Sequence, residues 1–304
     1  MNILTIFTPT YNRAYTLTNL YHSLCFQTSN CFEWLIIDDG SDDNTDEKIK
    51  EWINDNKIRI KYYKQKNRGK HIAHNRALKL CKTDLFFCVD SDDILDERAV
   101  QWVLELKEEE EGNNILGFYM RKGDLGGNAK GEGWPENKKY LYLNELYQQY
   151  NFKGEAAIIL KTKLVRNYIF PPFKQEKFLR ESVFYDQINK LAPMRLDNRV
   201  CYFFEYKDDG YTKQGWRLEY RNPIGAGYNL LHHIEYESRK KEKIKHMGMF
   251  FAWKKVMKVN DPLYKTIYVP VYVRFLGYFL TGHYKKLFVK HKEAFQDEVK
   301  CFIN

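Results

Sequence analysis

Three acidic residues follow an apolar run in the segment FFCVDSDDIL, which spans residues 86–95. Asp90 and Asp92 stand one residue apart, and Asp93 follows directly. Two carboxylates at this spacing can hold a hard divalent cation together with the phosphates bound to it. The alternative is that Asp93 or Asp96 caps the next helix. Because a cap accounts for one acid and not for three, the segment favours metal or phosphate chemistry.

A second acidic segment, IIDDGSDDNT, places Asp39 at the end of another apolar run. A carboxylate at a strand end can accept the N–H of a uracil or thymine base. The rest of the segment is typical of turns and helix caps, because Asp-Gly and Asn-Thr pairs favour both. We therefore interpret Gly40, Ser41 and Asn44 as turn or cap residues, with Asn44 or Thr45 starting the next helix, and Asp39 as a functional residue.

Two more polar segments add aromatic and cationic side chains. In TPTYNR, Tyr11 can stack on a base and Arg13 can meet a phosphate. In KNRGKHIAHN, Gly69 permits close backbone approach and Lys70 lies among cations that suit a pyrophosphate. Each segment is a weak signal alone, since an ordinary basic helix start explains the second equally well.

The order of expected elements brings these four segments together. Strands are expected at residues 3–7, 33–37, 58–63 and 85–89, and helices at 17–26, 44–53, 70–80 and 97–110. This alternation predicts an α/β fold, with a Rossmann-like, mainly parallel sheet and helices on both faces. Ligands of such sheets bind beyond the carboxyl ends of the strands, where all four polar segments fall.

In this order and spacing, TPTYNR, IIDDGSDD, the Asn67/Gly69/Asn75 cluster and VDSDD resemble the family-2 inverting glycosyltransferases of the bacterial surface-polysaccharide type. The resemblance is close over residues 1–110 and looser to about 232. It implies a GT-A fold in which Pro9, Tyr11 and Asp39 hold the base. The nucleotide-binding set that we expect is Thr8, Pro9, Tyr11, Arg13, Asp39, Asn67, Gly69, Lys70, Asn75, Asp90 and Ser91.

The resemblance also implies a metal and a catalytic base. Asp92, with Asp90 beside it, would ligate Mn²⁺ or Mg²⁺. In EKFLRESVFYDQI, Glu181 occupies the place of the family's base, and Ser182 stands where an Asp often does. Asp186 is the second candidate. Without the resemblance, Glu181 would be read as a solvated carboxylate at a helix start. The sequence departs from the family at His74, where many members carry Arg.

After residue 111 the alternation is less regular. We expect a flexible loop at 123–133, which is rich in glycine, strands at 156–160 and 200–205, a helical segment at 178–189 and mostly helix over 220–260. YKDDGYT, at 206–212, resembles a downstream motif of bacterial family members. These features divide the chain into a nucleotide-sugar-binding half at 1–110, an acceptor-binding half at 111–232 and a basic helical extension at 233–304.

Positive charge is concentrated at the C-terminal end. The formal net charge is +9, but residues 1–110 carry 15 basic and 19 acidic side chains (−4), and residues 211–304 carry 18 and 8 (+10). This distribution argues against a nucleic-acid-binding chain and for one local anionic partner. The aromatic and lysine-rich segment 267–292 is too short to span a bilayer. We expect it to lie on an anionic membrane, the alternative being a helix pair packed on the catalytic domain.

The expected activity is transfer of a hexose or N-acetylhexosamine from a UDP- or dTDP-sugar to a glycan or lipid-linked glycan, in capsule or other surface-polysaccharide synthesis. The N-terminus does not resemble a signal peptide, and none of the six cysteines forms a CxxC pair. We therefore expect a cytoplasmic enzyme, peripheral on the inner face of the cell membrane. The alternatives are a haloacid-dehalogenase-like phosphohydrolase and a non-catalytic sugar-nucleotide-binding membrane scaffold.

Overall fold

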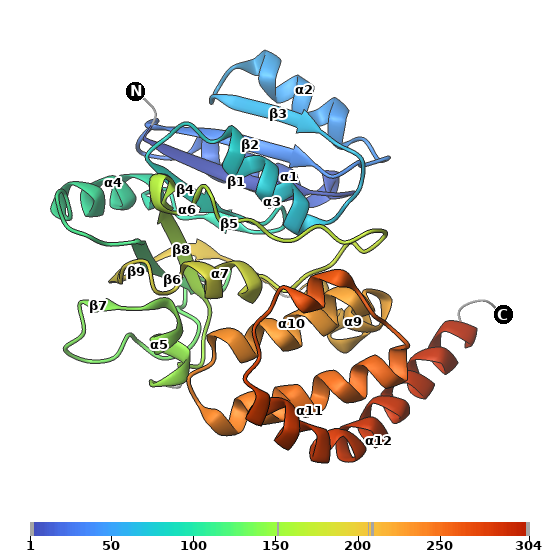
Figure 1. Cartoon of the computed structure of the whole chain (residues 1–304). Coiled ribbons are helices and arrows are strands. Elements are labelled where there is room, and N and C mark those ends of the chain that lie inside the picture. The colour runs from blue at the N-terminus through green and yellow to red at the C-terminus, as the bar shows by residue number, and fades with distance from the viewer. Residues whose placement is uncertain (1–2, 151, 206, 208–209, 302–304) are drawn as a thin grey trace. The chain divides into compact units, whose positions relative to one another are not determined.

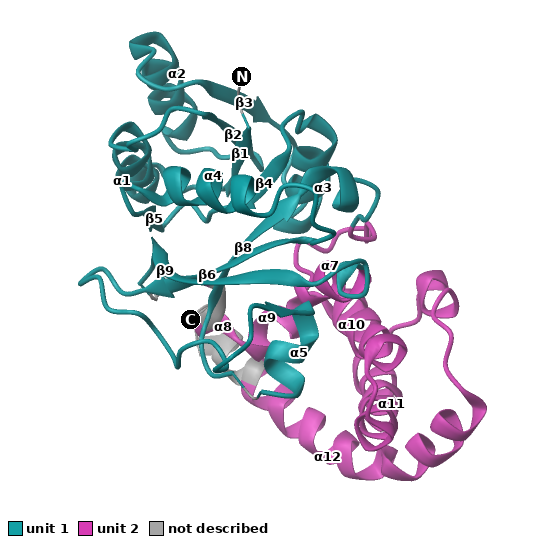
Figure 2. Cartoon of the chain, turned by 90° about the vertical axis from the view of Figure 1, so that its left-hand side faces the viewer, with its two compact units in different colours: residues 1–169, 188–205 teal, residues 170–187, 206–304 magenta. Residues whose placement is uncertain are grey.

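The computed structural model describes residues 3–150, 152–205, 207 and 210–301 (Figure 1). The chain divides into two compact units, which Figure 2 colours separately. Unit 1 comprises residues 1–169 and 188–205, and unit 2 comprises residues 170–187 and 206–304. These units follow compactness rather than function, so the three-part functional division stays a prediction.

Unit 1 contains a mixed sheet in the strand order β3-β2-β1-β4-β8-β6-β9-β5, with β7 beside β9. Strands β1 to β4 run parallel, as do β6 and β9, whereas β8 is antiparallel to both of its neighbours. The strands are β1 Leu4–Thr10, β2 Phe32–Asp38, β3 Ile60–Lys64, β4 Leu85–Cys88, β5 Ile94–Leu95, β6 Gly117–Gly123, β7 Tyr140–Leu141, β8 Ala156–Lys161 and β9 Met194–Phe203.

Helices cover both faces of this sheet. Leu4 and Ile6 of β1 belong to a core cluster with side chains of α1 (Ala14–Cys25), α2 (Thr45–Asp55) and α4 (Ala99–Glu109). Phe7 points to the opposite face, against His74 of α3 (Lys70–Leu80). Because both faces are buried, β1 and β2 consist almost entirely of buried residues, which is typical of parallel strands. The expected α/β architecture is confirmed.

Two strands are longer than expected because their backbone pairing continues beyond the apolar run in the sequence. β1 continues to Thr10 because Pro9 and Thr10 remain in register with Ile37 and Asp38 of β2. Thr8 and Pro9 are therefore strand residues rather than loop residues. β9 begins at Met194, ahead of the expected residue 200, since it also pairs with β6, a strand that the sequence pattern did not indicate. The remaining helices of unit 1 are α5 Leu143–Gln148 and α6 Thr162–Val165.

Unit 2 is helical, as expected for the C-terminal extension. It contains most of α7 (Ser182–Ile188), then α8 Tyr211–Gln214, α9 Trp216–Arg221, α10 Pro223–Tyr236, α11 Lys240–Met257, the 3₁₀ turn Pro262–Lys265 and α12 Val271–Cys301. α11 and α12 cross at two glycines. A Cβ on Gly248 would lie 2.7 Å from the Cβ of Leu280, and one on Gly277 would lie 2.6 Å from that of Met247. None of the described helices combines the length and apolarity that spanning a bilayer requires.

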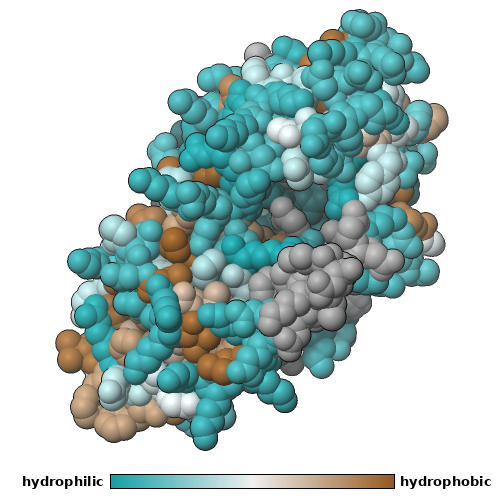
Figure 3. All heavy atoms as spheres, turned by 90° about the vertical axis from the view of Figure 1, so that its right-hand side faces the viewer, coloured by the Kyte–Doolittle hydropathy of each residue, from teal (hydrophilic) through white to brown (hydrophobic). Residues whose placement is uncertain are grey.

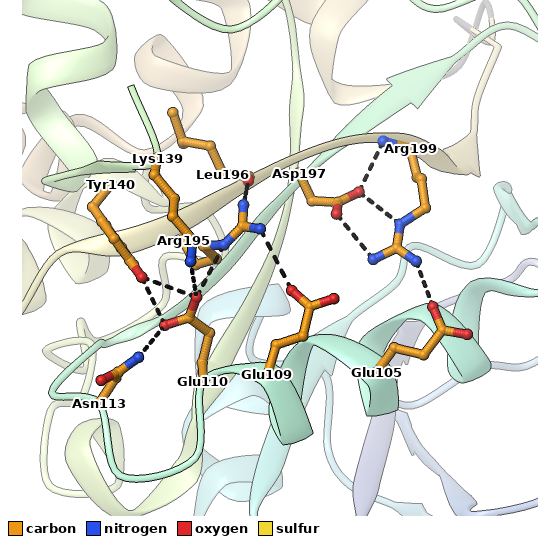
Figure 4. Close-up of polar contacts among 10 residues, drawn as sticks. All are labelled: Glu105, Glu109, Glu110, Asn113, Lys139, Tyr140, Arg195, Leu196, Asp197 and Arg199. Carbon is orange, nitrogen blue, oxygen red and sulfur yellow. Dashed lines mark hydrogen bonds and ion pairs between the residues drawn. The ribbon is translucent and has the colours of Figure 1, made fainter. Parts of the chain in front are cut away.

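A buried carboxylate fixes the β7–β9 edge of the sheet to the end of α4 (Figure 4). Glu110 is 1% exposed and accepts hydrogen bonds from Tyr140 Oη (2.9 Å) and Arg195 Nε (3.0 Å). Asn113 Nδ2 and Lys139 Nζ also contact it, at 2.7 and 3.2 Å. Burial alone would raise the pKa of Glu110, but the hydrogen bonds from Asn113, Tyr140 and Lys139 outweigh it and lower the pKa below the ordinary 4.5.

We predict that Glu110→Gln lowers the free energy of unfolding at pH 7 by about 1–3 kcal/mol, because the neutral amide cannot satisfy the cationic donors. The contribution of a carboxylate with a lowered pKa is complete above 4.5 and is lost as the pH falls through its folded value. The difference between variant and wild type should therefore shrink below about pH 4.5. Urea unfolding across pH checks this. Glu111→Gln, an exposed neighbour, is the control, and a pH-independent difference would contradict the assignment.

Candidate active site

The carboxyl ends of the parallel strands meet at one edge of unit 1, as the topology predicts. Thr10 of β1 is in register with Asp38 of β2, which is in register with Lys64 of β3. The loops that follow these strands, and the loop after β4, carry the polar segments identified in the sequence. Hydrogen bonds between the loops bring the segments together at this edge.

The carboxylate of Asp39 joins the loop after β2 to the loop after β3. Its Oδ1 accepts Gln65 Nε2 at 2.8 Å and its Oδ2 accepts the main-chain N–H of Gly69 at 2.6 Å. The N–H of Arg68 lies 3.0 and 3.1 Å from the two oxygens. Asp39 is 5% exposed, so these contacts fix the loop that leads into α3. The structure thus gives Asp39 a structural role, and its expected contact with a base stays a prediction.

The loops after β1 and β2 are also joined to each other. The N–H of Asn12 donates to Ser41 Oγ at 2.9 Å, and the N–H of Asp42 donates to Asn12 Oδ1 at 3.0 Å. Asp43 accepts the N–H of Ala14 at the start of α1 and the N–H of Thr45 at the start of α2, both at 3.1 Å. The side chain of Asn44 makes no capping bond, so the side-chain oxygens that accept N–H groups at these two helix starts come from Asp43 rather than from Asn44 or Thr45.

The loop after β4 is the most highly charged part of the site. Lys70 Nζ at the start of α3 donates to Asp90 Oδ1 at 2.6 Å. Tyr202 of β9 bonds this loop at two points: its hydroxyl accepts the N–H of Asp90 at 3.1 Å and donates to Asp93 Oδ2 at 2.5 Å. Lys122 Nζ of β6 lies 4.0 Å from the centre of the Tyr202 ring. Asp93 is therefore a buried, hydrogen-bonded acid and not the cap of α4.

Burial and mutual repulsion perturb these carboxylates. Burial is the largest cause that raises the pKa of Asp92, and the charge of Asp90 adds to it. The same two causes, in the same order, raise the pKa of Asp93 to about 7. For Asp90 burial also acts upward, but the charges of Lys70 and Lys122 outweigh it and the pKa is lowered. Of the three carboxylates, Asp90 is thus the one whose charged form is favoured by its surroundings, through Lys70 and Lys122.

The other expected nucleotide-binding residues differ in their surroundings. Thr8 is buried, and its Oγ1 accepts Trp34 Nε1 at 3.0 Å, so this side chain belongs to the core. Pro9 is buried within β1, whereas Tyr11 is 46% exposed just past the strand end. Arg13 donates to Tyr15 Oη at 2.6 Å. Asn67, Gly69 and Ser91 lie in the loops at this edge of the sheet, whereas Asn75 lies within α3, past its first turn.

His74, the departure from the family pattern, is a core residue. It is 7% exposed and its ring lies edge-on to Phe7 and Phe86, at 5.8 and 5.4 Å between ring centres. Burial, with Lys70 as a smaller cause, lowers the pKa of His74 to about 3. The imidazole is therefore neutral at pH 7 and packs as an aromatic ring between α3 and the sheet.

Glu181 directly precedes α7 in unit 2. It is exposed, and its main-chain oxygen accepts the N–H of Phe184 at 2.9 Å. The chain that leads to it is fixed to the start of α10: Glu176 accepts the N–H groups of Ile224 and Gly225 at 2.7 and 2.6 Å. Because Glu181 lies in unit 2 and the strand-end loops lie in unit 1, its role as the base stays a prediction.

Asp186, the second candidate base, is buried one turn further along α7. Its Oδ2 lies 3.5 Å from the Nδ1 atoms of both His232 and His233 of α10. These contacts favour a packing role over that of an exposed base. Tyr206, Asp208 and Asp209 of the YKDDGYT segment lie outside the described residues.

Three residues that help to shape the site gave no local signal in the sequence. Gln65 is an ordinary polar residue after β3, and Lys122 and Tyr202 come from strands far along the chain from Asp90. Only knowledge that β6 and β9 share the sheet with β4 would have brought Lys122 and Tyr202 into consideration.

Comparison with known proteins identifies the family. Residues 5–169, more than half of the chain, match the family model Glycosyl transferase family 2. The chain belongs to glycosyl transferase family 2. The expected membership is confirmed, and neither the phosphohydrolase nor the scaffold alternative gains support.

Relatives of this family 2 chain include several bacterial enzymes. It is 24% identical over 175 residues to glycosyltransferase GlyG of Streptococcus pneumoniae, which covers 55% of this chain and 58% of GlyG. It is 29% identical over 187 residues to poly(ribitol-phosphate) beta-N-acetylglucosaminyltransferase TarP of Staphylococcus aureus, covering 60% and 50%. It is 31% identical over 209 residues to the chondroitin synthase of Escherichia coli, covering 66% and 28%. The chain thus spans about half the length of the first two relatives.

Solved structures share the fold. TarS residues 1–349 of S. aureus, in complex with UDP-GlcNAc, match with a TM-score of 0.60 at 17% identity, over 95% of this chain and 92% of that one. The complex of the same TarS segment with UDP matches with a TM-score of 0.57 at 18% identity, over 98% and 92%. This family 2 chain therefore has the expected GT-A fold with a helical C-terminal region.

We predict that Asp39→Ala frees the loop between β3 and α3. The buried donors of Gln65, Arg68 and Gly69 would lose their acceptor, at a cost of about 2–4 kcal/mol in the free energy of unfolding. Amide hydrogen exchange at Arg68 and Gly69 should become faster. Asp42→Ala, which removes an exposed carboxylate of the same loop, should change stability by less than about 0.5 kcal/mol. Equal exchange rates in both variants would show that Asp39 does not hold the loop.

Proposed function

We propose that this chain transfers a sugar from a UDP- or dTDP-sugar to an acceptor hydroxyl, with inversion at the anomeric carbon. The observation that carries the proposal is the meeting of Asp39, Lys70, Asp90 and Asp92 at one edge of a sheet in a family 2 chain. Tyr11, exposed beyond β1, offers an aromatic face for a base. Lys70 and Arg13 offer cations for a pyrophosphate.

The residues of the Asp90–Asp93 loop suit Mn²⁺ or Mg²⁺. Carboxylate oxygens are the ligands that these hard cations prefer, and Mg²⁺ in proteins is usually held by one or two carboxylates together with substrate phosphates. Among the described residues, no three His, Cys, Asp or Glu side chains form a preformed metal cluster. Asp92, assisted by Asp90, would hold the ion. Once bound, the ion would neutralise charge that develops on the departing nucleoside diphosphate.

The proposed reaction is a single in-line displacement. Glu181 takes the proton of the acceptor hydroxyl as its oxygen attacks the anomeric carbon. The bond from that carbon to the diphosphate oxygen breaks, and the bonding electrons leave with the nucleoside diphosphate. Lys70 and Arg13 would stabilise that leaving group electrostatically. Attack from the face opposite the leaving group inverts the configuration. The position of Glu181 ahead of α7 and its exposure are consistent with a base that meets an incoming acceptor.

The relatives support a narrower proposal for the donor and the pathway. TarS is described in complex with UDP-GlcNAc, and TarP is a beta-N-acetylglucosaminyltransferase that acts on poly(ribitol-phosphate). We therefore propose a hexose or N-acetylhexosamine donor, with a uridine nucleotide as the first to test. The acceptor would be a glycan or lipid-linked glycan of a cell-surface polysaccharide such as a capsule, used at the inner face of the cell membrane.

We predict that UDP or dTDP raises the melting temperature in the presence of Mn²⁺. A ligand at a hundredfold excess over its Kd stabilises the folded state by about 2.7 kcal/mol, which amounts to several degrees. The shift should disappear in Asp92→Ala and persist in Asp84→Ala, which removes an exposed carboxylate at the opposite end of β4. If the folded wild type shows no shift with any nucleoside diphosphate, the proposal fails.

We predict that Glu181→Gln lowers turnover at least about a hundredfold while the nucleotide-induced thermal shift is retained, because the amide cannot accept the proton. Release of nucleoside diphosphate in the presence of acceptor measures the turnover. Asp186→Asn is the comparison. A fully active Glu181→Gln enzyme beside an inactive, folded Asp186→Asn enzyme would transfer the role of base to Asp186.

A further inference from the structure

One face of α12 packs on the rest of unit 2, and the opposite face is mostly exposed, although Tyr278 on that face also contacts the ring of Phe251 of α11. Val273, Gly277, Thr281 and Phe288 are buried and recur every four or seven residues, so they form a single line along the helix. This line meets α11 at the Gly248–Gly277 crossing. The buried contacts of α12 therefore run along this line, with Val273 and Phe288 as its apolar side chains.

The first turns of α12 nevertheless present large apolar side chains on the other face. We define the aromatic face as Val271, Tyr272, Phe275, Leu276, Tyr278 and Phe279, which are exposed by 42–81%. Their spacing places them in two adjacent stripes, 271/275/278 and 272/276/279, opposite the buried line. Tyr268, just before the helix, is 74% exposed. Figure 3 shows hydrophobic side chains gathered over the helices of unit 2.

Cations surround the aromatic face. Residues 254–292 contain nine Lys and Arg residues and a single acid, Asp261. The exposed cations include Lys255, Lys265, Arg274, Lys285, Lys286 and Lys290. Lys255 Nζ lies 5.5 Å from the ring centre of Tyr278, and Lys286 and Lys290 continue the exposed side of the helix beyond Phe279. A partner for this surface must be apolar and negatively charged at once.

We propose that the aromatic face of α12 docks on an anionic lipid bilayer. Phe275 and Phe279 enter the boundary between headgroups and acyl chains, the tyrosines stay at headgroup level, and the lysines contact lipid phosphates. A second copy of the chain fits less well, because two such surfaces would bring nine cations and one acid against the same set. Membrane docking itself does not depend on the proposed function. Only the purpose we give it, access to a lipid-linked acceptor, rests on that function.

The test is flotation with vesicles, one set of phosphatidylcholine alone and one with about a third phosphatidylglycerol. Wild type should float with the anionic vesicles and lose binding as salt is raised. Phe275→Ser/Phe279→Ser should reduce binding at least about tenfold, and Lys285→Glu/Lys286→Glu should reduce it on anionic vesicles. Because these side chains are exposed, all variants should keep the wild-type melting temperature.

Phe26→Ser, which removes an exposed phenylalanine of unit 1 (72% exposed), is the matched control and should bind like wild type. Wild type that does not float, or a Phe275/Phe279 variant that floats fully, overturns the proposal. If wild type is oligomeric and does not bind vesicles, and the Phe275/Phe279 variant is monomeric, the face instead joins two copies of the chain. Nucleoside diphosphate release with a water-soluble acceptor, measured on the same proteins, distinguishes this failure from failure of the transferase proposal.

Discussion

The candidate site depends on the buried carboxylate of Asp39. Three donors from the β3–α3 loop converge on it, two of them main-chain N–H groups. Buried donors that lose their acceptor are costly, so these hydrogen bonds favour the arrangement of the loop seen in the structure. That arrangement also requires Gly40, because a Cβ there would lie 2.9 Å from the main-chain N of Asn67. The start of α3, and with it Lys70, is therefore positioned from the end of β2.

Lys70 in turn helps to position the acidic loop, Asp90–Asp93. Lys70 contacts Asp90, Tyr202 holds the main chain of Asp90 and the carboxylate of Asp93, and Lys122 lies over the ring of Tyr202. Side chains from α3 and β9 thus contact this loop of four residues directly, and Lys122 of β6 supports Tyr202. A loop held in this way loses little entropy when it binds a ligand, which is the advantage of a preorganised site.

The sequence was most informative where structure is local. The limits of α3 were predicted to the residue, and the first four strands were found because each is a short apolar run between turn residues. It was least informative where pairing is distant. Tyr202 stands 109 residues from Asp93, and no periodic pattern reports that two segments so far apart share a sheet. The interpretation of Asp39 was incomplete for a related reason: its type and place suggested a ligand contact, but in the structure its carboxylate accepts hydrogen bonds from Gln65, Arg68 and Gly69 of the β3–α3 loop.

The charge balance at the acidic loop bears on what the site can accept. The three carboxylates of the loop face three cations, Lys70, Lys122 and Arg13. Lys122 also pairs with Glu155, with its Nζ 3.4 Å from Glu155 Oε2. Before a nucleotide binds, the positive charges at this loop are therefore matched by carboxylates. Two phosphates brought beside these carboxylates would add like charge to a partly buried place, where repulsion is poorly screened. Under the proposed function, a divalent cation that arrived with the phosphates would remove this conflict. The arrangement of acids thus suits a nucleotide that binds as its metal complex better than one that binds alone.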